Sequence, residues 1–295
     1  MSALEAIRDQ LRSRRAGLGD LIQRRQSMDD FGASRPEPAG SSRASIDLGN
    51  GLTADRLTGP GSRTARKILY VHGGAYISGS ATSHRPMGHA LVAGTQSIVT
   101  MLNYRLAPEH PFPAAAQDVA TGFEAMAAEG GAYIVVGDSA GAGAALAGFI
   151  LARDSGIPLP RAIVCISPWV DLTLAHDSHV RRADSDPMLT LDGLKCAAEL
   201  YLSGTAATHP LASPLLADLS GLPPLLIQVG TDEILFDDAT ALAGRARSFG
   251  GPVRISTWDG MFHVWHAFLG MLPEADRAIL EICDFINDHF RDIQS

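Results

Sequence analysis

Lysine is scarce in this 295-residue chain. Only two of its 24 basic residues, Lys67 and Lys195, are lysines, and the basic residues form no stripe. The 32 acidic residues leave a formal net charge of −8. Binding to nucleic acid depends on clustered positive charge that neutralises phosphates. We therefore expect no nucleic acid among the partners of this protein.

Long hydrophobic runs are also missing. The longest run of small or apolar residues, Ala140 to Ala152, is too short to span a bilayer. Glu5 and Asp9 interrupt the basic-then-apolar pattern of a secretory leader. We expect a cytoplasmic protein with no stable membrane insertion.

Cysteine occurs only three times, as Cys165, Cys196 and Cys283. These positions lie too far apart for the ligand spacing of a metal site. We expect three buried free thiols in a protein of a reducing compartment, and no bound metal.

What the chain does contain is ample apolar material, 46% of its residues against 19% charged, which excludes disorder for most of it. Short β-branched runs alternate with helical patterns, which indicates an α/β fold whose mostly parallel sheet of about eight strands has helices on both faces. The first two strands follow each other directly and predict an antiparallel hairpin at one edge. The predicted strands are Ala44–Leu48, Leu52–Leu57, Lys67–His72, Ser97–Leu102, Tyr133–Val136, Ala162–Ile166, Leu225–Val229 and Val253–Trp258. The predicted helices are Arg85–Ala93, Ala114–Ala128, Ala140–Arg153, Asp237–Phe249 and Pro273–Phe290.

Two segments do not fit the strand–helix alternation. Residues 1–31 have apolar residues at helical spacing and predict one or two amphipathic helices, followed by a linker rich in Pro, Gly and Ser. The polar stretch after Asp171 contains a helical pattern near Leu191–Leu202 and is too long for a simple crossover. We expect residues 1–42 and 171–210 to form a cap, and residues 43–170 and 211–295 to form a catalytic domain.

A candidate nucleophile lies in the pentapeptide Gly137-Asp138-Ser139-Ala140-Gly141, between a predicted strand and an Ala/Gly-rich helix. A nucleophile elbow needs this context, because a serine on a sharp turn requires small neighbours. The alternative is a tight strand–helix turn with no chemistry. A nucleotide site does not fit, because Leu146 stands where G-x-G-x-x-G requires its last glycine, and no P-loop motif occurs.

A candidate oxyanion hole lies at the end of an earlier strand, in His72-Gly73-Gly74-Ala75. Acyl transfer creates a negative oxygen, and the N–H groups of glycines can approach it closely. We expect Gly73 and Gly74 to supply two donors and Ala140 a third. His72 is expected to hold the loop by hydrogen bonding. Without chemistry, the same motif would be a Gly-Gly turn.

The base and its orienting acid should leave the last two strands. His263 follows the last strand and is the favoured base, with His266 as the alternative. Asp232 follows the preceding strand and is the favoured acid, with Glu233 as the alternative. The resulting order Ser139, Asp232, His263 is that of α/β-hydrolases.

From about Lys67 to its C-terminus, the sequence resembles the bacterial esterases of the hormone-sensitive-lipase group, within the α/β-hydrolase fold. The shared motifs are His72-Gly73-Gly74-Ala75, the block from Tyr104 to Ala114, the Ser139 elbow, Ser167-Pro168-Trp169, Asp232-Glu233-Ile234-Leu235 and Phe262-His263. The resemblance implies structural roles for Arg105 and Glu109, and frequent homodimers joined near the last strand. The chain departs from the family at Ala75 and Ala142, where glycine is usual, and at Asn103, where an acidic residue is often found.

These residues predict a serine carboxylesterase that hydrolyses short- to medium-chain acyl esters through an acyl-enzyme on Ser139, without a cofactor. A lactone hydrolase or an amide-cleaving enzyme would use the same triad. A non-catalytic receptor on a hydrolase scaffold is a further alternative, but such proteins typically lose the histidine. A cap over the strand ends would enclose the pocket and favour acyl chains of about eight carbons or fewer.

Overall fold

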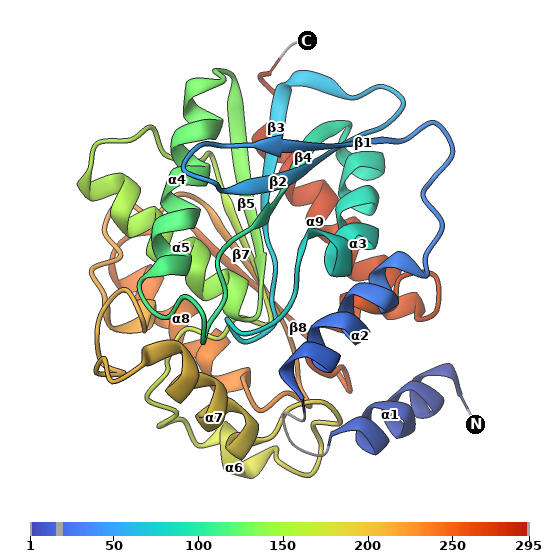
Figure 1. The fold of residues 1–295 in the computed structure, drawn as a ribbon, viewed down its shortest axis with the longest axis vertical. Helices are drawn as coiled ribbons and strands as arrows, with labels where there is room; N and C mark the ends of the chain where they lie inside the picture. Colours follow the sequence, from blue (N-terminus) through green and yellow to red (C-terminus); the bar gives the residue numbers. More distant parts are fainter. Residues whose placement is uncertain (1, 16–19, 294–295) are drawn as a thin grey trace.

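A single eight-stranded sheet forms the centre of the molecule in the computed structural model, which describes residues 2–15 and 20–293 (Figure 1). The spatial order of the strands is β1-β2-β4-β3-β5-β6-β7-β8. Their bounds are β1 (Ser42–Asp47), β2 (Thr53–Thr58), β3 (Arg63–Val71), β4 (Ser97–Asn103), β5 (Ala132–Asp138), β6 (Ile163–Ile166), β7 (Leu225–Gly230) and β8 (Val253–Trp258). Each predicted strand is present within a few residues of its expected bounds.

The sheet is antiparallel at one edge and parallel elsewhere. β1 pairs antiparallel with β2, and β2 pairs antiparallel with β4. All later pairings are parallel, which confirms the predicted opening hairpin and the series of crossovers. Every residue of β5, β6 and β7 is buried, as expected for strands covered on both faces.

Helices cover the two faces of the sheet in separate groups. The helices α3 (Ala81–Thr95) and α9 (Pro273–His289) pack on one face. The other face carries α4 (Ala114–Ala128), α5 (Ala140–Asp154) and α8 (Phe236–Ser248). Each face has its own apolar cluster, so the sheet is the middle of three layers.

Four helices lie at the end of the sheet where the parallel strands finish, in the lower half of Figure 1. They are α1 (Ala3–Arg14), α2 (Leu21–Ala33), α6 (Ser178–Arg181) and α7 (Leu191–Leu202). The short 3₁₀ turns η1 (Pro214–Leu216) and η2 (Trp265–Phe268) complete the loops. The prediction of helices near the N-terminus and in the segment between β6 and β7 is confirmed.

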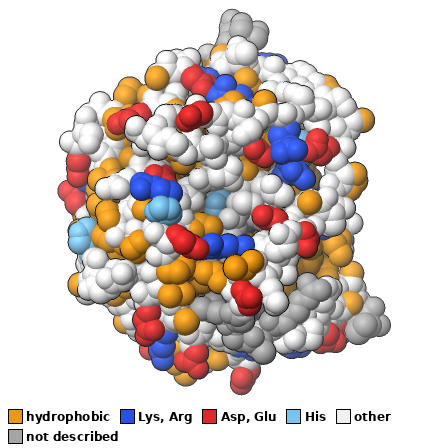
Figure 2. Space-filling view, in the orientation of Figure 1, with side chains coloured by type: hydrophobic (Ala, Val, Ile, Leu, Met, Phe, Trp, Pro, Cys, Tyr) orange, Lys and Arg blue, Asp and Glu red, His pale blue; other side chains and the backbone are white. Residues whose placement is uncertain are grey.

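Cys165 and Cys283 are buried free thiols as predicted, whereas the prediction for Cys196 is wrong. Cys196 is exposed because it lies on the side of α7 opposite the buried Leu194, Ala197 and Ala198. Within residues 2–15 and 20–293, no helix has the length and apolar character needed to cross a bilayer. Positive and negative side chains are interspersed on the face in Figure 2.

Candidate active site

Ser139 occupies a strained turn between β5 and α5. Its backbone has φ 53° and ψ −124°, a conformation that non-glycine residues rarely adopt. Only glycine fits on either side: a Cβ at Gly137 would lie 2.7 Å from the carbonyl oxygen of Gly141, and one at Gly141 would lie 2.1 Å from that of Val71. The backbone N–H of Ser139 donates to the carbonyl of Ile166 at 2.8 Å. This packing holds the serine side chain at the end of the central strand, as the elbow motif predicts.

His263 lies in the loop after β8 and reaches the serine. Its Nε2 is 2.9 Å from the hydroxyl oxygen of Ser139, although 124 residues separate the two in the chain. The imidazole is buried. The structure thus brings together the serine and the histidine that the sequence favoured. The alternative, His266, is buried elsewhere, with its Nε2 2.7 Å from Oε1 of Gln228.

The prediction that Asp232 orients this histidine is wrong, because Glu233 occupies that position. One carboxylate oxygen of Glu233 is 3.0 Å from Nδ1 of His263. The other accepts hydrogen bonds from the hydroxyl of Ser167, at 2.8 Å, and from the N–H of Gly230, at 2.6 Å. Glu233 is completely buried. In the turn after β7 its side chain therefore points inward to the histidine.

Asp232 points away from the histidine, toward the N-terminal helix. Its carboxylate is 2.6 Å from the guanidinium of Arg8, which also donates to the carbonyls of Gly260 and Ser185, both at 2.9 Å. Sequence reasoning could not choose between adjacent acids, because the partner of Asp232 is 224 residues away. In the structure Glu233 begins a buried run with Ile234 and Leu235, whereas Asp232 is partly exposed.

The acid and the histidine form a buried coupled pair. Burial lowers the pKa of His263, but the hydrogen bond and the negative charge of Glu233 outweigh it, so that the pKa lies above its ordinary value. Burial raises the pKa of Glu233, against the opposing effect of His263. Because Nδ1 faces a carboxylate, it carries the proton of the neutral imidazole, and Nε2 is left free to accept the serine proton.

The predicted oxyanion hole requires one correction. The N–H of Gly73 is not free, since it donates to the buried carboxylate of Asp138 at 3.0 Å. Within residues 2–15 and 20–293, the N–H groups of Gly74, Ala75 and Ala140 have no hydrogen-bond acceptor. Ala75 was missed because nothing in the sequence shows that Asp138 engages the first glycine. The free donors beside Ser139 are therefore those of Gly74, Ala75 and Ala140.

A protein-family model described as alpha/beta hydrolase fold matches residues 68–267. The chain belongs to this family. Over 223 residues it is 48% identical to the acetyl-hydrolase of Streptomyces hygroscopicus, and the match covers 75% of each chain.

Two solved structures resemble the whole chain. One is an esterase from the bacterial hormone-sensitive lipase family, with 37% identity and a TM-score of 0.93 over 97% of this chain and 98% of the other. The second is EstE5 soaked with p-nitrophenyl butyrate, with 38% identity and a TM-score of 0.92 over 98% and 99% of the two chains. The protein is thus a carboxylic ester hydrolase of the hormone-sensitive-lipase-like bacterial esterases.

The loop after β3 of this esterase is supported by helix α2. Gly74 has φ 121°, and a Cβ there would lie 2.1 Å from the carbonyl oxygen of Ser78, so the tight loop requires glycine. Arg25 donates to the carbonyl of Ile77 at 2.8 Å and forms an ion pair with Glu109 at 2.7 Å. Arg24 donates to the hydroxyl of Ser78 at 3.2 Å. The N-terminal segment is therefore part of the scaffold of the site.

Arg105 and Glu109, which the resemblance makes structural, both form ion pairs. Arg105 lies 2.7 Å from the carboxylate of Asp118 and Glu109 pairs with Arg25. The guanidinium of Arg25 holds the pKa of Glu109 down, at about 2. Neither residue contacts Ser139 or His263 among the contacts of the described residues.

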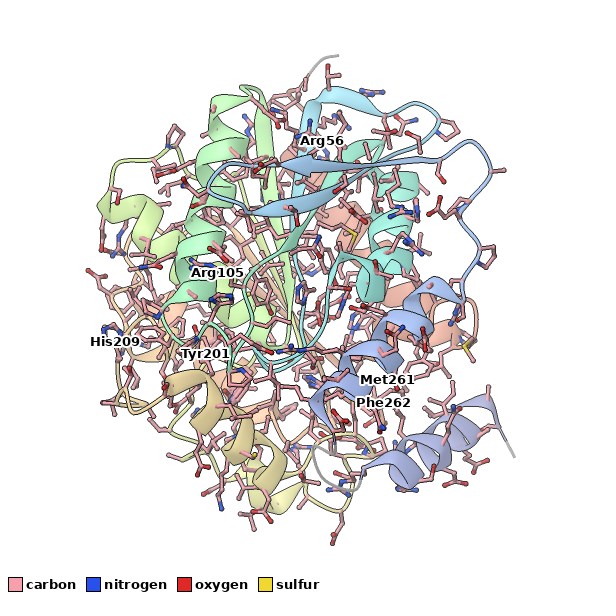
Figure 3. All side chains as sticks on the ribbon, viewed as in Figure 1. Arg56, Arg105, Tyr201, His209, Met261 and Phe262 are labelled. Atoms are coloured by element: carbon pink, nitrogen blue, oxygen red, sulfur yellow. The ribbon has the colours of Figure 1, made fainter. Side chains whose placement is uncertain are left out.

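Stacked aromatic rings join the loop after β3 of this esterase to helix α7. The ring of Tyr76, directly after Ala75, stacks on that of Tyr201 from α7, with 3.8 Å between centroids and 5° between planes. Phe112 meets Tyr201 edge-on at 5.8 Å. Figure 3 shows Tyr201 near the start of α4 and Met261 and Phe262 between α1 and α2. A Cβ at Gly143, in the first turn after Ser139, would meet the Tyr76 hydroxyl at 2.5 Å, so these rings stand beside the nucleophile.

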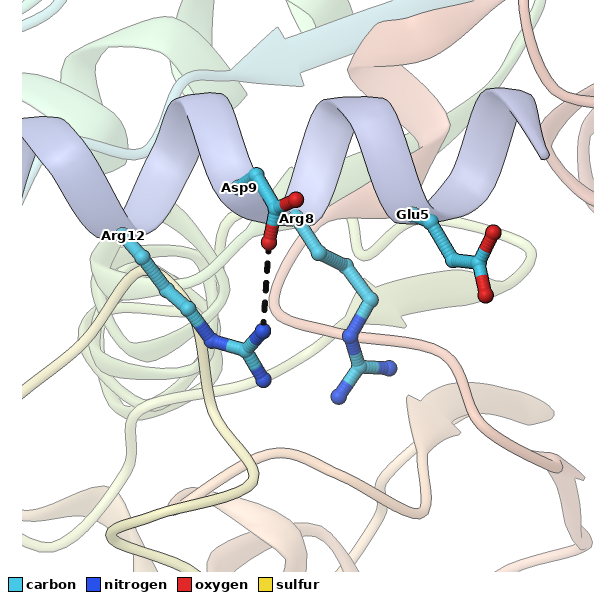
Figure 4. Close-up of a pocket in the computed structure, with 4 residues that line it drawn as sticks. All are labelled: Glu5, Arg8, Asp9 and Arg12. Carbon is cyan, nitrogen blue, oxygen red and sulfur yellow. Dashed lines mark hydrogen bonds and ion pairs between the residues drawn. The ribbon is translucent and has the colours of Figure 1, made fainter. Parts of the chain in front are cut away.

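A shallow pocket on α1 is lined by Glu5, Arg8, Asp9 and Arg12 (Figure 4). Arg12 pairs with Asp9 at 3.5 Å, while Arg8 extends away from both. This pocket lies outside the serine–histidine site and is lined by charged residues, so we assign no substrate to it.

Proposed function

We propose that this esterase is a serine hydrolase that cleaves short- to medium-chain acyl esters through an acyl-enzyme on Ser139. The observation that carries the proposal is the continuous row of hydrogen bonds from Ser139 through His263 to Glu233, at 2.9 and 3.0 Å. Such a row is what an activated serine nucleophile requires.

In the proposed first half-reaction, the hydroxyl oxygen of Ser139 attacks the ester carbonyl while Nε2 of His263 takes its proton. The carbonyl oxygen becomes negative and is stabilised by the N–H groups of Gly74, Ala75 and Ala140. Glu233 stabilises the imidazolium that forms. The C–O bond to the alcohol then breaks, and His263 returns the proton to the departing oxygen.

In the second half-reaction, water attacks the acyl group on Ser139 while His263 accepts one of its protons. Collapse of this second tetrahedral intermediate releases the carboxylic acid and returns the proton to Ser139. The atoms balance with water as the only co-reactant. This chemistry needs no cofactor.

The preference for short chains rests on the cap. Residues 1–42 and 171–210 supply the helices over the strand ends, above a catalytic domain of residues 43–170 and 211–295. The stacked Tyr76 and Tyr201 set a rigid wall beside α5. A bounded pocket gains about 0.8 kcal/mol per enclosed methylene only while space remains. The acetyl and butyryl groups named for two similar proteins agree with chains of about eight carbons or fewer.

Three further expectations belong to this proposal. The substrate is a small ester in solution, and the protein acts in the cytoplasm. Two copies would pair through β8, which is one of the two edge strands of the sheet and is partly exposed.

The test is a series of p-nitrophenyl esters from acetate to palmitate, assayed with the wild type and with Ser139→Ala. We expect kcat/KM to peak in the short to medium range and Ser139→Ala to lose at least about 10³-fold in kcat. Retained turnover in the variant would overturn the serine mechanism. A preference for long or emulsified esters would overturn the chain-length proposal alone.

A further inference from the structure

The carboxylate of Asp138 is buried directly behind the candidate oxyanion hole, although the reaction does not use it. Asp138 ends β5 and precedes Ser139, and it is 2% exposed. Its Oδ1 accepts hydrogen bonds from the N–H of Gly73, at 3.0 Å, and from the hydroxyl of Tyr70, at 2.9 Å. A charge at such a depth is costly without a partner.

His84 of α3 is that partner. Its Nε2 lies 3.3 Å from Oδ2 of Asp138, and both side chains are buried. Its Nδ1 faces the hydroxyl of Ser83 at 2.8 Å. Burial lowers the pKa of His84, but the carboxylate of Asp138 outweighs it, so that the pKa lies above its ordinary value. The hydroxyl of Ser83 donates to the carbonyl of Ser80 at 2.9 Å, so it accepts from Nδ1 of His84, while Nε2 faces the carboxylate of Asp138. With a proton on each ring nitrogen, the pair is an imidazolium and a carboxylate whose charges cancel.

The pair contacts the oxyanion loop at its first glycine. A Cβ at Gly73 would lie only 2.2 Å from Oδ2 of Asp138, so the carboxylate packs directly against the backbone there. One residue later, Gly74 supplies a free N–H. The acceptor on Asp138 thus fixes the loop to the same strand end that carries Ser139. The nucleophile and the oxyanion donors are therefore held in a fixed position relative to each other.

We propose that Asp138 and His84 are positioning residues for catalysis: Asp138 anchors the Gly73–Ala75 loop to the nucleophile, and His84 cancels a negative charge that would oppose the forming oxyanion. This inference rests on the proposed acyl-enzyme mechanism. A carboxylate left uncompensated near a developing negative oxygen would weaken its stabilisation in a low-dielectric site. The effect falls on the transition state and so on kcat.

The acceptor is tested by comparing Asp138→Asn with Asp138→Ala. Asparagine keeps an oxygen that can accept from Gly73, whereas alanine removes it. We expect Asp138→Ala to lower kcat at least about tenfold more than Asp138→Asn, with KM changing by less than about threefold in both. The affinity for butylboronic acid, whose serine adduct places an oxygen among the same donors, should fall in parallel with kcat. Equal kcat values and equal boronate affinities for the two variants would overturn the anchor.

The charge balance is tested by His84→Gln alone and combined with Asp138→Asn. The single variant leaves a carboxylate without its countercharge, and we expect at least about a tenfold loss in kcat. The double variant lacks both charges of the pair and should recover most of that loss in kcat. The effects of the two substitutions would then be non-additive. If the two losses add instead, the charge-cancelling role is wrong. If His84→Gln fails to fold, the double variant is compared with Asp138→Ala. The proposal predicts a higher kcat for the double variant. An equal or lower kcat would contradict the proposed role of the Asp138–His84 pair.

Asp118→Asn is the matched control, because Asp118 is also a buried carboxylate in an ion pair but contacts Arg105 instead of the oxyanion loop. It should leave kcat and boronate affinity unchanged, even where the melting temperature falls. Failure of the proposed function is separately visible. If the proposed function is wrong, butylboronic acid will not inhibit the wild type. If only this inference is wrong, butylboronic acid will still inhibit the wild type, and the Asp138 variants will have the same kcat and the same boronate affinity.

Discussion

The guanidinium of Arg8 lies 2.6 Å from the carboxylate of Asp232, which joins the first helix of the chain to the turn that carries Glu233. The same guanidinium donates to the carbonyl of Gly260, in the loop that carries His263, and to that of Ser185 in the middle insertion. One side chain thus connects α1 and the segment between β6 and β7 to the loops that carry Glu233 and His263. Asp232 serves this connection.

Exchanging each acid for its amide should give very different results. Glu233→Gln removes the charge that stabilises the imidazolium, and we expect kcat to fall by about 10³–10⁴-fold. Asp232→Asn leaves the Glu233–His263 contact in place and should cost no more than a few-fold. Steady-state kinetics on p-nitrophenyl butyrate measure both. The reverse ranking would show that the acid is Asp232 after all.

Arg8→Ala should loosen α1 without touching the reacting groups. The lost ion pair and the two lost hydrogen bonds to carbonyls are expected to cost about 1–2 kcal/mol of unfolding free energy, because the groups are largely shielded from water. Limited trypsin digestion should then release the N-terminal segment faster than in the wild type. Arg12→Ala is the matched control, since the one ion pair that Arg12 forms with a described residue is to its helix neighbour Asp9. Equal digestion rates for the two variants would contradict the role of Arg8.

Arg25→Ala should lower activity through the oxyanion loop. Arg25 donates to the carbonyls of Ile77 and Ala107, so its removal frees the loop that holds Gly74 and Ala75. We expect kcat to fall by about tenfold, since misplaced donors act mainly on the transition state. Arg35→Ala, which loses a bond to Leu269 instead, is the control and should keep its kcat. If Arg25→Ala changes KM and leaves kcat unchanged, Arg25 acts on the shape of the pocket, and its role in positioning the oxyanion donors is contradicted.

The pH dependence of kcat/KM should follow His263. Only neutral His263 can accept the serine proton, so activity should be lost as pH falls through its pKa. Because the net effect of Glu233 raises that pKa above the ordinary value, the loss should begin at a higher pH than for a free imidazole. In Glu233→Gln the residual activity should show a midpoint at lower pH, because only the smaller effects of the Asp186 and Asp138 charges then oppose burial. A midpoint that does not move would contradict the coupling.

The fold was largely predictable because its signals are local. Continuous apolar runs marked the buried strands, and the helix Leu191–Leu202 was visible from its own periodicity. The elbow at Ser139 and the base at His263 followed from their places after strands. The choice between Asp232 and Glu233 and the engagement of Gly73 were not predictable, because the direction of a side chain in a turn depends on distant partners, Arg8 and Asp138. The prediction that Cys196 is buried was wrong for a related reason. Its exposure depends on which face of α7 packs against the rest of the protein, and those contacts are distant in the sequence.

Covalent labelling with a fluorophosphonate, followed by peptide mass spectrometry, tests the central claim most directly. Fluorophosphonates react with serines that a neighbouring base activates. We predict one label per chain, located on Ser139, with activity lost in proportion to labelling and no label on Ser139→Ala. Complete inactivation with the label on another residue, or full turnover by a chain labelled at Ser139, would contradict the account.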